Sequence, residues 1–181
     1  AGRDLVPTGS FGMYLRTLKL EPYGSKILMY DGTEREGQGT HAAIFSLDAG
    51  EKDSQQTADA MIRLYSEYLF AASKHEEIAF HLSNGFLFRY DKWKEGYRLK
   101  LDGDKAEMVK TEKKDESYQQ FRSYLNRLFS YVSTRSLGQD LEKIEISQMQ
   151  VGDILLQSGS PGGCAVIVDI CCVPEGETYF L

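Results

Sequence analysis

The chain has 181 residues, a formal net charge of −6 and a pI of about 5.2. This length suits one domain with its own hydrophobic core, so we expect residues 1–181 to fold as a single domain. The acidic balance argues against a nucleic-acid-binding protein, which usually carries a basic patch. No run approaches the roughly 18 apolar residues of a membrane-spanning helix. Strand-forming residues at 178–181 predict that the natural protein continues past Leu181.

The first part of the chain is predicted to hold one helix and two strands. Residues 10–19 place apolar side chains at helical spacing, and Ser10 is available as the N-cap. A Glu-Pro-Tyr-Gly-Ser turn precedes a predicted strand over 26–30. A second strand is predicted over 40–47, where side chains alternate between two faces and His41 lies on one of them.

Residues 48–74 contain the clearest helical pattern. Asp53 and Gln56 have the spacing of a capping box at its start. A polar stripe contains Gln55, Asp59 and Arg63 at i, i+4 and i+8. A solvated helix face and a functional surface are both compatible with this polar stripe. The apolar stripe consists of Ala58, Met61, Tyr65, Tyr68 and Leu69.

Alternating apolar residues and turn signals predict three β-hairpins. The first pairs 78–82 with 86–90, and the second pairs 97–101 with 107–110. The third lies in 152–168, where a Ser-Gly-Ser-Pro-Gly turn joins two apolar runs.

The order of these elements predicts the fold class. Residues 91–96 are expected to form a turn that carries Trp93, and 117–134 a second long helix. Hairpins between two long helices favour an α+β fold, in which an antiparallel sheet packs against two main helices.

The cysteines are predicted to be buried, unreactive thiols. On one extended strand, at about 3.3 Å per residue, Cys164 and Cys171 would lie more than about 20 Å apart. A disulfide requires Cα atoms within about 7 Å, so this pair cannot bridge. A bridge between the adjacent Cys171 and Cys172 would be strained. Free cysteines of this kind behave as small hydrophobic residues.

No metal or cofactor motif is present in the sequence. His41, His75 and His81 lack the spacing of metal ligands, and the cysteines form no paired motif. The glycine-rich run 159–163 lacks both the Lys-Ser/Thr ending and the following helix of a phosphate-binding loop. A strand follows this run, which also excludes a serine nucleophile elbow. We therefore expect no metal and no cofactor.

The chain has the scaffold of a thiol hydrolase without its reactive groups. A thiolate nucleophile is usually activated at a helix N-terminus, and its base usually comes from a neighbouring element. Here the start of the first long helix offers Thr57, and the late strand offers Gly163 followed by Cys164. A threonine hydroxyl has a far higher pKa than a thiol and needs a strong base at close range.

Several stretches resemble an uncharacterised bacterial family, the domain of unknown function 4846. Residues 53–64 (DSQQTADAMIRL) resemble its DLQQCADAVMRL, and residues 152–163 (GDILLQSGSPGG) resemble the start of its GDVFIQGGSPGHAVIV. The resemblance covers about 11–181. Shorter matches follow the same order at His41-Ala42-Ala43, Asp48-Ala49-Gly50, Glu67-Tyr68-Leu69, Ser83-Asn84-Gly85-Phe86, Trp93 and Gly96-Tyr97-Arg98.

This resemblance implies an exported or lipid-anchored envelope protein of Gram-negative bacteria. It also implies a layout similar to that of papain-like cell-wall amidases and peptidases. The family pattern has Cys where this chain has Thr57 and His where it has Gly163, so a nucleophile and its base would both be missing. The residues expected around the cleft are His41, Asp48, Gln56, Thr57, Asp59, Arg63, Gln157, Ser160 and Gly163.

Three functions remain open from the sequence. The first is a relative of papain-like amidases that has lost its catalytic pair and binds peptide or peptidoglycan fragments in the old cleft. The second is an active hydrolase that uses Thr57 with His41 or Asp59. The third is a structural or interaction domain without a small-molecule site.

Overall fold

The computed structural model describes residues 2–3, 5–48, 57–172 and 178–180. The predicted capping box of Asp53 and Gln56 lies outside these residues. In the described part of the chain, no helix has the length and apolar character needed to cross a membrane.

The structure confirms the α+β class, because helices and antiparallel strands are both present. The α-helices are α1 (Phe11–Thr17), α2 (Thr57–Ala71), α3 (Tyr90–Lys94), α4 (Tyr118–Phe129) and α5 (Thr134–Leu137), with 3-10 turns η1 (His75–Glu77) and η2 (Ile146–Gln148). The strands are β1 (Gly2–Arg3), β2 (Ala79–His81), β3 (Leu87–Arg89), β4 (Tyr97–Asp102), β5 (Lys105–Lys110), β6 (Ile154–Gln157), β7 (Gly163–Val166), β8 (Ile170–Cys172) and β9 (Thr178–Phe180).

The strands form several small sheets and not the single sheet that we expected. The three predicted hairpins are present as β2–β3, β4–β5 and β6–β7, each a separate two-stranded sheet. Strands β1, β8 and β9 form a further sheet with β8 in the middle. Each hairpin pairs two strands that are neighbours in the sequence, and, among the strands described, no hairpin strand pairs with a strand of another hairpin. The hairpins contact helices: β7 lies against α2, and β4 lies against α3.

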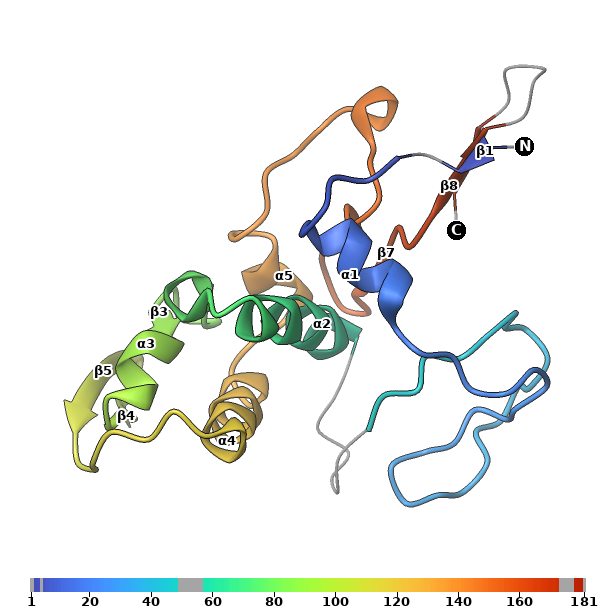
Figure 1. Ribbon diagram of the computed structural model, residues 1–181. Helices are drawn as coiled ribbons and strands as arrows, with labels where there is room; N and C mark the ends of the chain where they lie inside the picture. The colour runs from blue at the N-terminus through green and yellow to red at the C-terminus, as the bar shows by residue number, and fades with distance from the viewer. Residues whose placement is uncertain (1, 4, 49–56, 173–177, 181) are drawn as a thin grey trace.

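The main core lies between α2, α4 and the β2–β3 hairpin. In Figure 1, α2 crosses the middle of the molecule with α4 beneath it. Phe121 and Leu128 on α4 are fully buried, as helical spacing predicts, and so is Tyr124 beside them. The Tyr124 hydroxyl donates to the Phe88 carbonyl at 2.9 Å, so the buried phenol is satisfied.

The long region between α1 and α2 contains no strand in its described residues. The strands predicted over 26–30 and 40–47 are wrong, because only two isolated bridges form there, Leu28–Glu34 and Leu20–Phe45. Alternation had predicted strands, but each segment pairs with its neighbour at one bridge only, and no ladder extends beyond it among the described residues. By contrast, α1 begins after Ser10 as predicted, and the Ser10 hydroxyl accepts from the Met13 amide at 3.2 Å.

Two further local predictions differ from the structure. The predicted turn around Trp93 is the short helix α3, which buries the indole while the Arg98 guanidinium lies 4.2 Å from the ring centre. The helix predicted over 117–134 ends at Phe129. A separate helix, α5, then begins after Ser133, whose hydroxyl accepts from the Ser136 amide.

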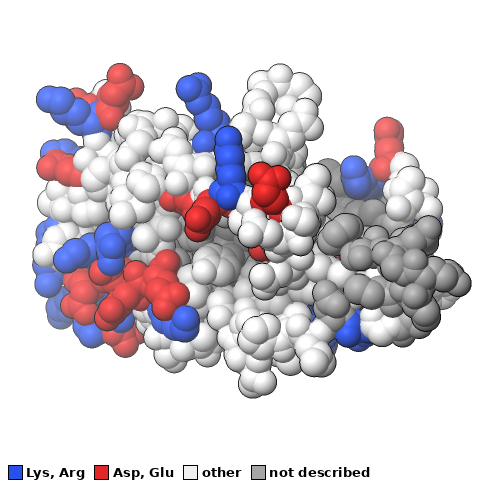
Figure 2. Space-filling view, turned by 90° about the horizontal axis from the view of Figure 1, so that it is seen from above, with Lys and Arg blue, Asp and Glu red and all other residues white. Residues whose placement is uncertain are grey.

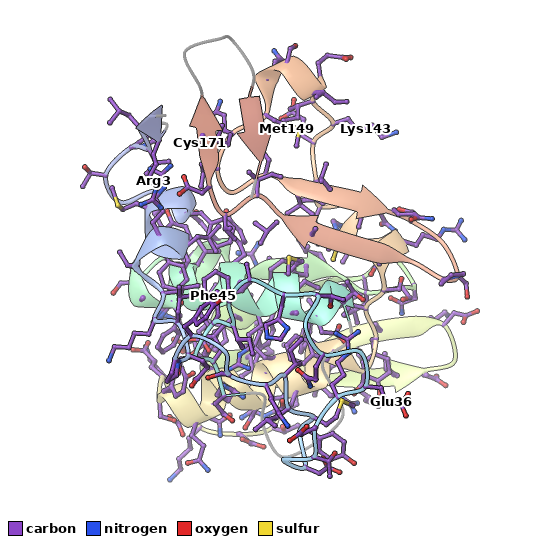
Figure 3. All side chains as sticks on the ribbon, turned by 90° about the vertical axis from the view of Figure 1, so that its right-hand side faces the viewer. Arg3, Glu36, Phe45, Lys143, Met149 and Cys171 are labelled. Atoms are coloured by element: carbon purple, nitrogen blue, oxygen red, sulfur yellow. The ribbon has the colours of Figure 1, made fainter. Side chains whose placement is uncertain are left out.

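Asp169 connects the β1–β8–β9 sheet to α1. Its carboxylate accepts from the Arg16 guanidinium at 2.5 Å and from Arg3 Nε at 2.5 Å. Figure 3 shows Arg3 and Cys171 on the neighbouring strands β1 and β8. The Asp169 side chain is only 11% exposed and that of Arg16 is 14% exposed, whereas Arg3 is mostly in solvent. The pair with Arg16 is therefore the less screened of the two.

We expect Asp169→Asn to lower the free energy of unfolding at pH 7 by about 1–3 kcal/mol, because it leaves the Arg16 charge partly buried without its counter-ion. Burial alone would raise the pKa of Asp169, but the bonds from Arg3 and Arg16 outweigh it and lower that pKa. This stabilisation is therefore present above the unfolded pKa of about 3.9 and is lost as pH falls through the lower folded value. Urea unfolding across pH 3–7 tests it. The exposed Asp104→Asn is the control, and equal stability of Asp169→Asn and the parent at pH 7 would contradict the assignment.

Candidate functional site

The beginning of α2 lies against the beginning of β7. The Cys164 thiol donates to the Thr57 carbonyl at 3.2 Å, although the two residues are 107 positions apart. Thr57 is the first residue of α2 and its side chain is exposed. Figure 1 shows β7 beside this end of α2. The structure thus brings the start of α2 and the start of β7 together, where the resemblance implied a Cys and a His.

Gly163 leaves open space at this meeting point. It pairs with Gln157 across the β6–β7 hairpin, so the predicted residue Gln157 lies opposite it. A Cβ added at Gly163 would meet no atom within 4 Å. The neighbouring Gly162 is different, since a Cβ there would lie 2.2 Å from Thr134 Oγ1. A side chain is therefore accommodated at Gly163 but excluded at Gly162.

Cys164 is half-buried and faces α2, so it does not lie in the core as we had expected. Burial raises the pKa of the Cys164 thiol, and the nearby charge of Asp59 raises it further. A thiol with a raised pKa stays protonated at neutral pH, and the thiolate is the reactive form. This environment favours an unreactive thiol at Cys164.

The polar stripe of α2 is buried at Asp59 and Arg63, which are 4% and 5% exposed. A solvated helix face is therefore wrong for these two residues. The Arg63 guanidinium donates to the Asp48 carbonyl, and burial lowers the pKa of Arg63, followed by the neighbouring charge of Arg122. Arg122 lies 3.6 Å from the Asp48 carboxylate. Of the predicted residues, Asp48 and Arg63 thus form a second group, which links α2 to α4.

His41 does not join either group in the described contacts. Its Nε2 lies 3.0 Å from the Ser25 carbonyl, and it lines a cavity of about 630 Å³ formed by the segment 20–44. Ser160 lies in the exposed turn between β6 and β7. Gln56, also predicted for the cleft, lies outside the described residues.

The predictions from sequence missed two contacts, one at this site and one elsewhere in the described structure. One is the bond from Cys164 to Thr57, for which the only signal was the position of Cys164 beside Gly163. The other is the pair of His81 and Asp140, whose Nδ1 and Oδ1 atoms are 2.5 Å apart. These two residues are 59 positions apart and belong to no motif, so no sequence signal indicated the pair.

Comparison with family models gives a match over residues 2–181 to the model described as Domain of unknown function (4846). Comparisons with curated proteins and with solved structures find no match. Among the described residues, no group of three or more His, Cys, Asp or Glu side chains is arranged to hold a metal ion.

Proposed function

The chain belongs to the family described as Domain of unknown function (4846), and from that premise we propose that it is a relative of papain-like amidases that binds peptide or peptidoglycan fragments without cleaving them. The observation that carries this proposal is the contact between the start of α2 and the start of β7. We further propose that the protein acts in the cell envelope, where such fragments occur.

The proposal rests on an analogy with thiol hydrolases, in which a nucleophile at a helix start is paired with a base on a neighbouring element. A helix N-terminus lowers the pKa of a thiol placed there, and a base on an adjacent strand then completes the pair. Thr57 is the first residue of α2 and Gly163 the first of β7, the two positions that the analogy assigns to the nucleophile and its base. Neither a threonine hydroxyl nor a glycine supplies a thiolate or a proton acceptor. A Cβ at Gly163 would meet no atom within 4 Å, so a side chain or a group of a bound molecule has room there.

The alternative of an active hydrolase needs a base within hydrogen-bonding reach of the Thr57 hydroxyl. His41 is directed to the Ser25 carbonyl and lines a cavity among residues 20–44. No described contact joins His41 to Thr57, so the geometry gives no support to the form of this alternative that uses His41. The form that uses Asp59 as the base stays a second candidate.

We expect the natural chain to bind soluble muropeptides in a calorimetric titration and to release no product. The double variant Thr57→Cys with Gly163→His is expected to cleave an amide bond in the same muropeptides, because it restores a nucleophile at the helix start and a base beside it. The histidine would take the thiol proton and later give it to the leaving amine, and water would then hydrolyse the thioester. Mass spectrometry of the products measures the turnover.

The matched control is Thr57→Ala with Gly163→His, which fills the same space but has no nucleophile. Either single variant is also expected to be inactive, because the two groups act as a unit. A folded double variant without turnover would contradict the papain-like geometry. Absence of muropeptide binding by the natural chain would contradict the proposed ligand.

A further inference from the structure

A second site lies further along α2, away from Thr57. A groove of about 560 Å³ runs between α2, the segment after α5 and the start of β6. Its volume is within the range of roughly 300–1,000 Å³ that is typical of ligand sites. Apolar side chains line much of it: Phe11, Met61, Ile62, Tyr65, Phe80, Leu137, Leu141, Ile144 and Ile154. Neither Thr57 nor Gly163 belongs to the described lining.

All the charged side chains in the described lining are acidic. They are Glu77, Asp140, Glu142 and Asp153, and no Lys or Arg is among the lining residues. Figure 2, which views the molecule from above, shows acidic and basic side chains next to one another in the middle of a largely uncharged face. The described lining of the groove therefore combines an apolar wall with four acidic side chains.

Two of these carboxylates already have a side-chain partner. Glu77 lies 3.1 Å from Lys74 Nζ, and Asp140 lies 2.5 Å from His81 Nδ1. For Glu142 and Asp153, by contrast, the described residues provide no ion pair. Asp153 accepts from the Gln150 amide at 2.7 Å, which orients its carboxylate without neutralising it. These two acids are the positions at which a bound cation would be recognised.

The loop that carries Glu142 leaves apolar side chains in solvent beside this charge. Ile144 is 48% exposed and Ile146 is 75% exposed, and Tyr65 on the α2 wall is 36% exposed. Figure 3 shows Lys143 and Met149 on the same loop, which stands above the β6–β7 hairpin. An apolar surface that a monomer leaves uncovered is typical of a binding site.

We propose that this groove binds a short peptide segment that alternates apolar residues with Lys or Arg. The apolar side chains of such a segment would pack against Met61, Tyr65 and Ile154, and its cations would pair with Glu142 and Asp153. Charge complementarity favours this occupant. An acidic peptide would place like charges against Glu142 and Asp153. A neutral peptide would remove water from these carboxylates without supplying an opposite charge. The inference is independent of the proposed cleft at Thr57 and Gly163.

The test is a calorimetric titration of the chain with the peptide acetyl-Leu-Lys-Leu-Lys-Leu-amide. The same peptide with Gln or with Glu in place of Lys reports the contribution of charge. Glu142→Gln with Asp153→Asn is expected to weaken binding of the Lys peptide about tenfold, since each partly exposed ion pair contributes a few-fold in affinity. The matched control is Glu107→Gln with Asp104→Asn on the β4–β5 hairpin, which removes the same charge and is expected to leave binding unchanged.

NMR of the natural chain gives a second measurement that needs no variant. The methyl signals of Met61 and Ile154 are expected to shift on addition of the Lys peptide and to remain in place with the Glu peptide. No binding of the Lys peptide would overturn the proposal. Equal binding of the Lys and Gln peptides would overturn it as well. So would an equal loss of affinity for the Lys peptide in the groove variant (Glu142→Gln with Asp153→Asn) and in its control. Muropeptide binding in the Thr57 and Gly163 variants is measured separately, so the two proposals fail by different experiments.

Discussion

Phe121→Ala is expected to lower the free energy of unfolding by about 3–5 kcal/mol, the largest effect of any substitution considered for this protein. Phe121 is fully buried on α4, and its ring stacks on Phe70 with centroids 4.4 Å apart and meets Tyr90 edge-on at 5.4 Å. Removing the ring loses its burial and leaves a cavity among rigid aromatic neighbours that cannot collapse fully. Urea unfolding followed by circular dichroism measures the loss.

The control for this substitution is Tyr23→Ala. Tyr23 is fully exposed, so the same type of truncation is expected to change stability by less than about 0.5 kcal/mol. A loss below about 1.5 kcal/mol for Phe121→Ala would show that α4 does not contribute the central layer of the core.

Gly96→Ala is expected to destabilise the protein by about 3 kcal/mol. Gly96 has a φ of +93°, and a Cβ at this position would lie 2.1 Å from the Glu112 carbonyl oxygen. The Gly96 carbonyl also accepts from the amides of Thr111 and Glu112 at 3.1 and 3.0 Å, so the backbone cannot move away without breaking these bonds. Strain from the positive φ and overpacking against the backbone therefore add together.

Gly85→Ala separates these two causes. Gly85 has a similar φ of +82°, but a Cβ there would meet nothing within 4 Å. Only the backbone strain remains, and the expected loss is about 1 kcal/mol. Equal losses at Gly96 and Gly85 in thermal unfolding would contradict the clash with Glu112.

The elements that were predicted correctly are those whose stability is local. The N-cap of α1 at Ser10 and the hairpins β2–β3 and β4–β5 depend on residues within a few positions of one another, and their patterns are visible in the sequence. The strands expected over 26–30 and 40–47 failed for the opposite reason. A strand needs a second segment that pairs with it over several residues, and alternation says nothing about how far such pairing extends.

For the candidate site, too, residue identities came from the sequence and the proximity of distant residues came from the structure. The resemblance identified Thr57 and Gly163 as the positions that differ from the family pattern, and that identification needed no structure. Only the fold brings the start of α2 to the start of β7 across 107 positions. The groove beside Glu142 and Asp153 had no sequence signal at all, because its lining comes from five separate stretches of the chain.

The amino-acid sequence by itself determined the α+β class and the family, because local periodicity predicts helices and hairpins and a family match needs only residue identities. The tertiary structure alone decided that Asp59 and Arg63 are buried, that the Cys164 thiol faces Thr57 and that acidic side chains gather around an apolar groove. Burial and proximity between distant residues depend on how helices and hairpins pack, and no local pattern records that packing.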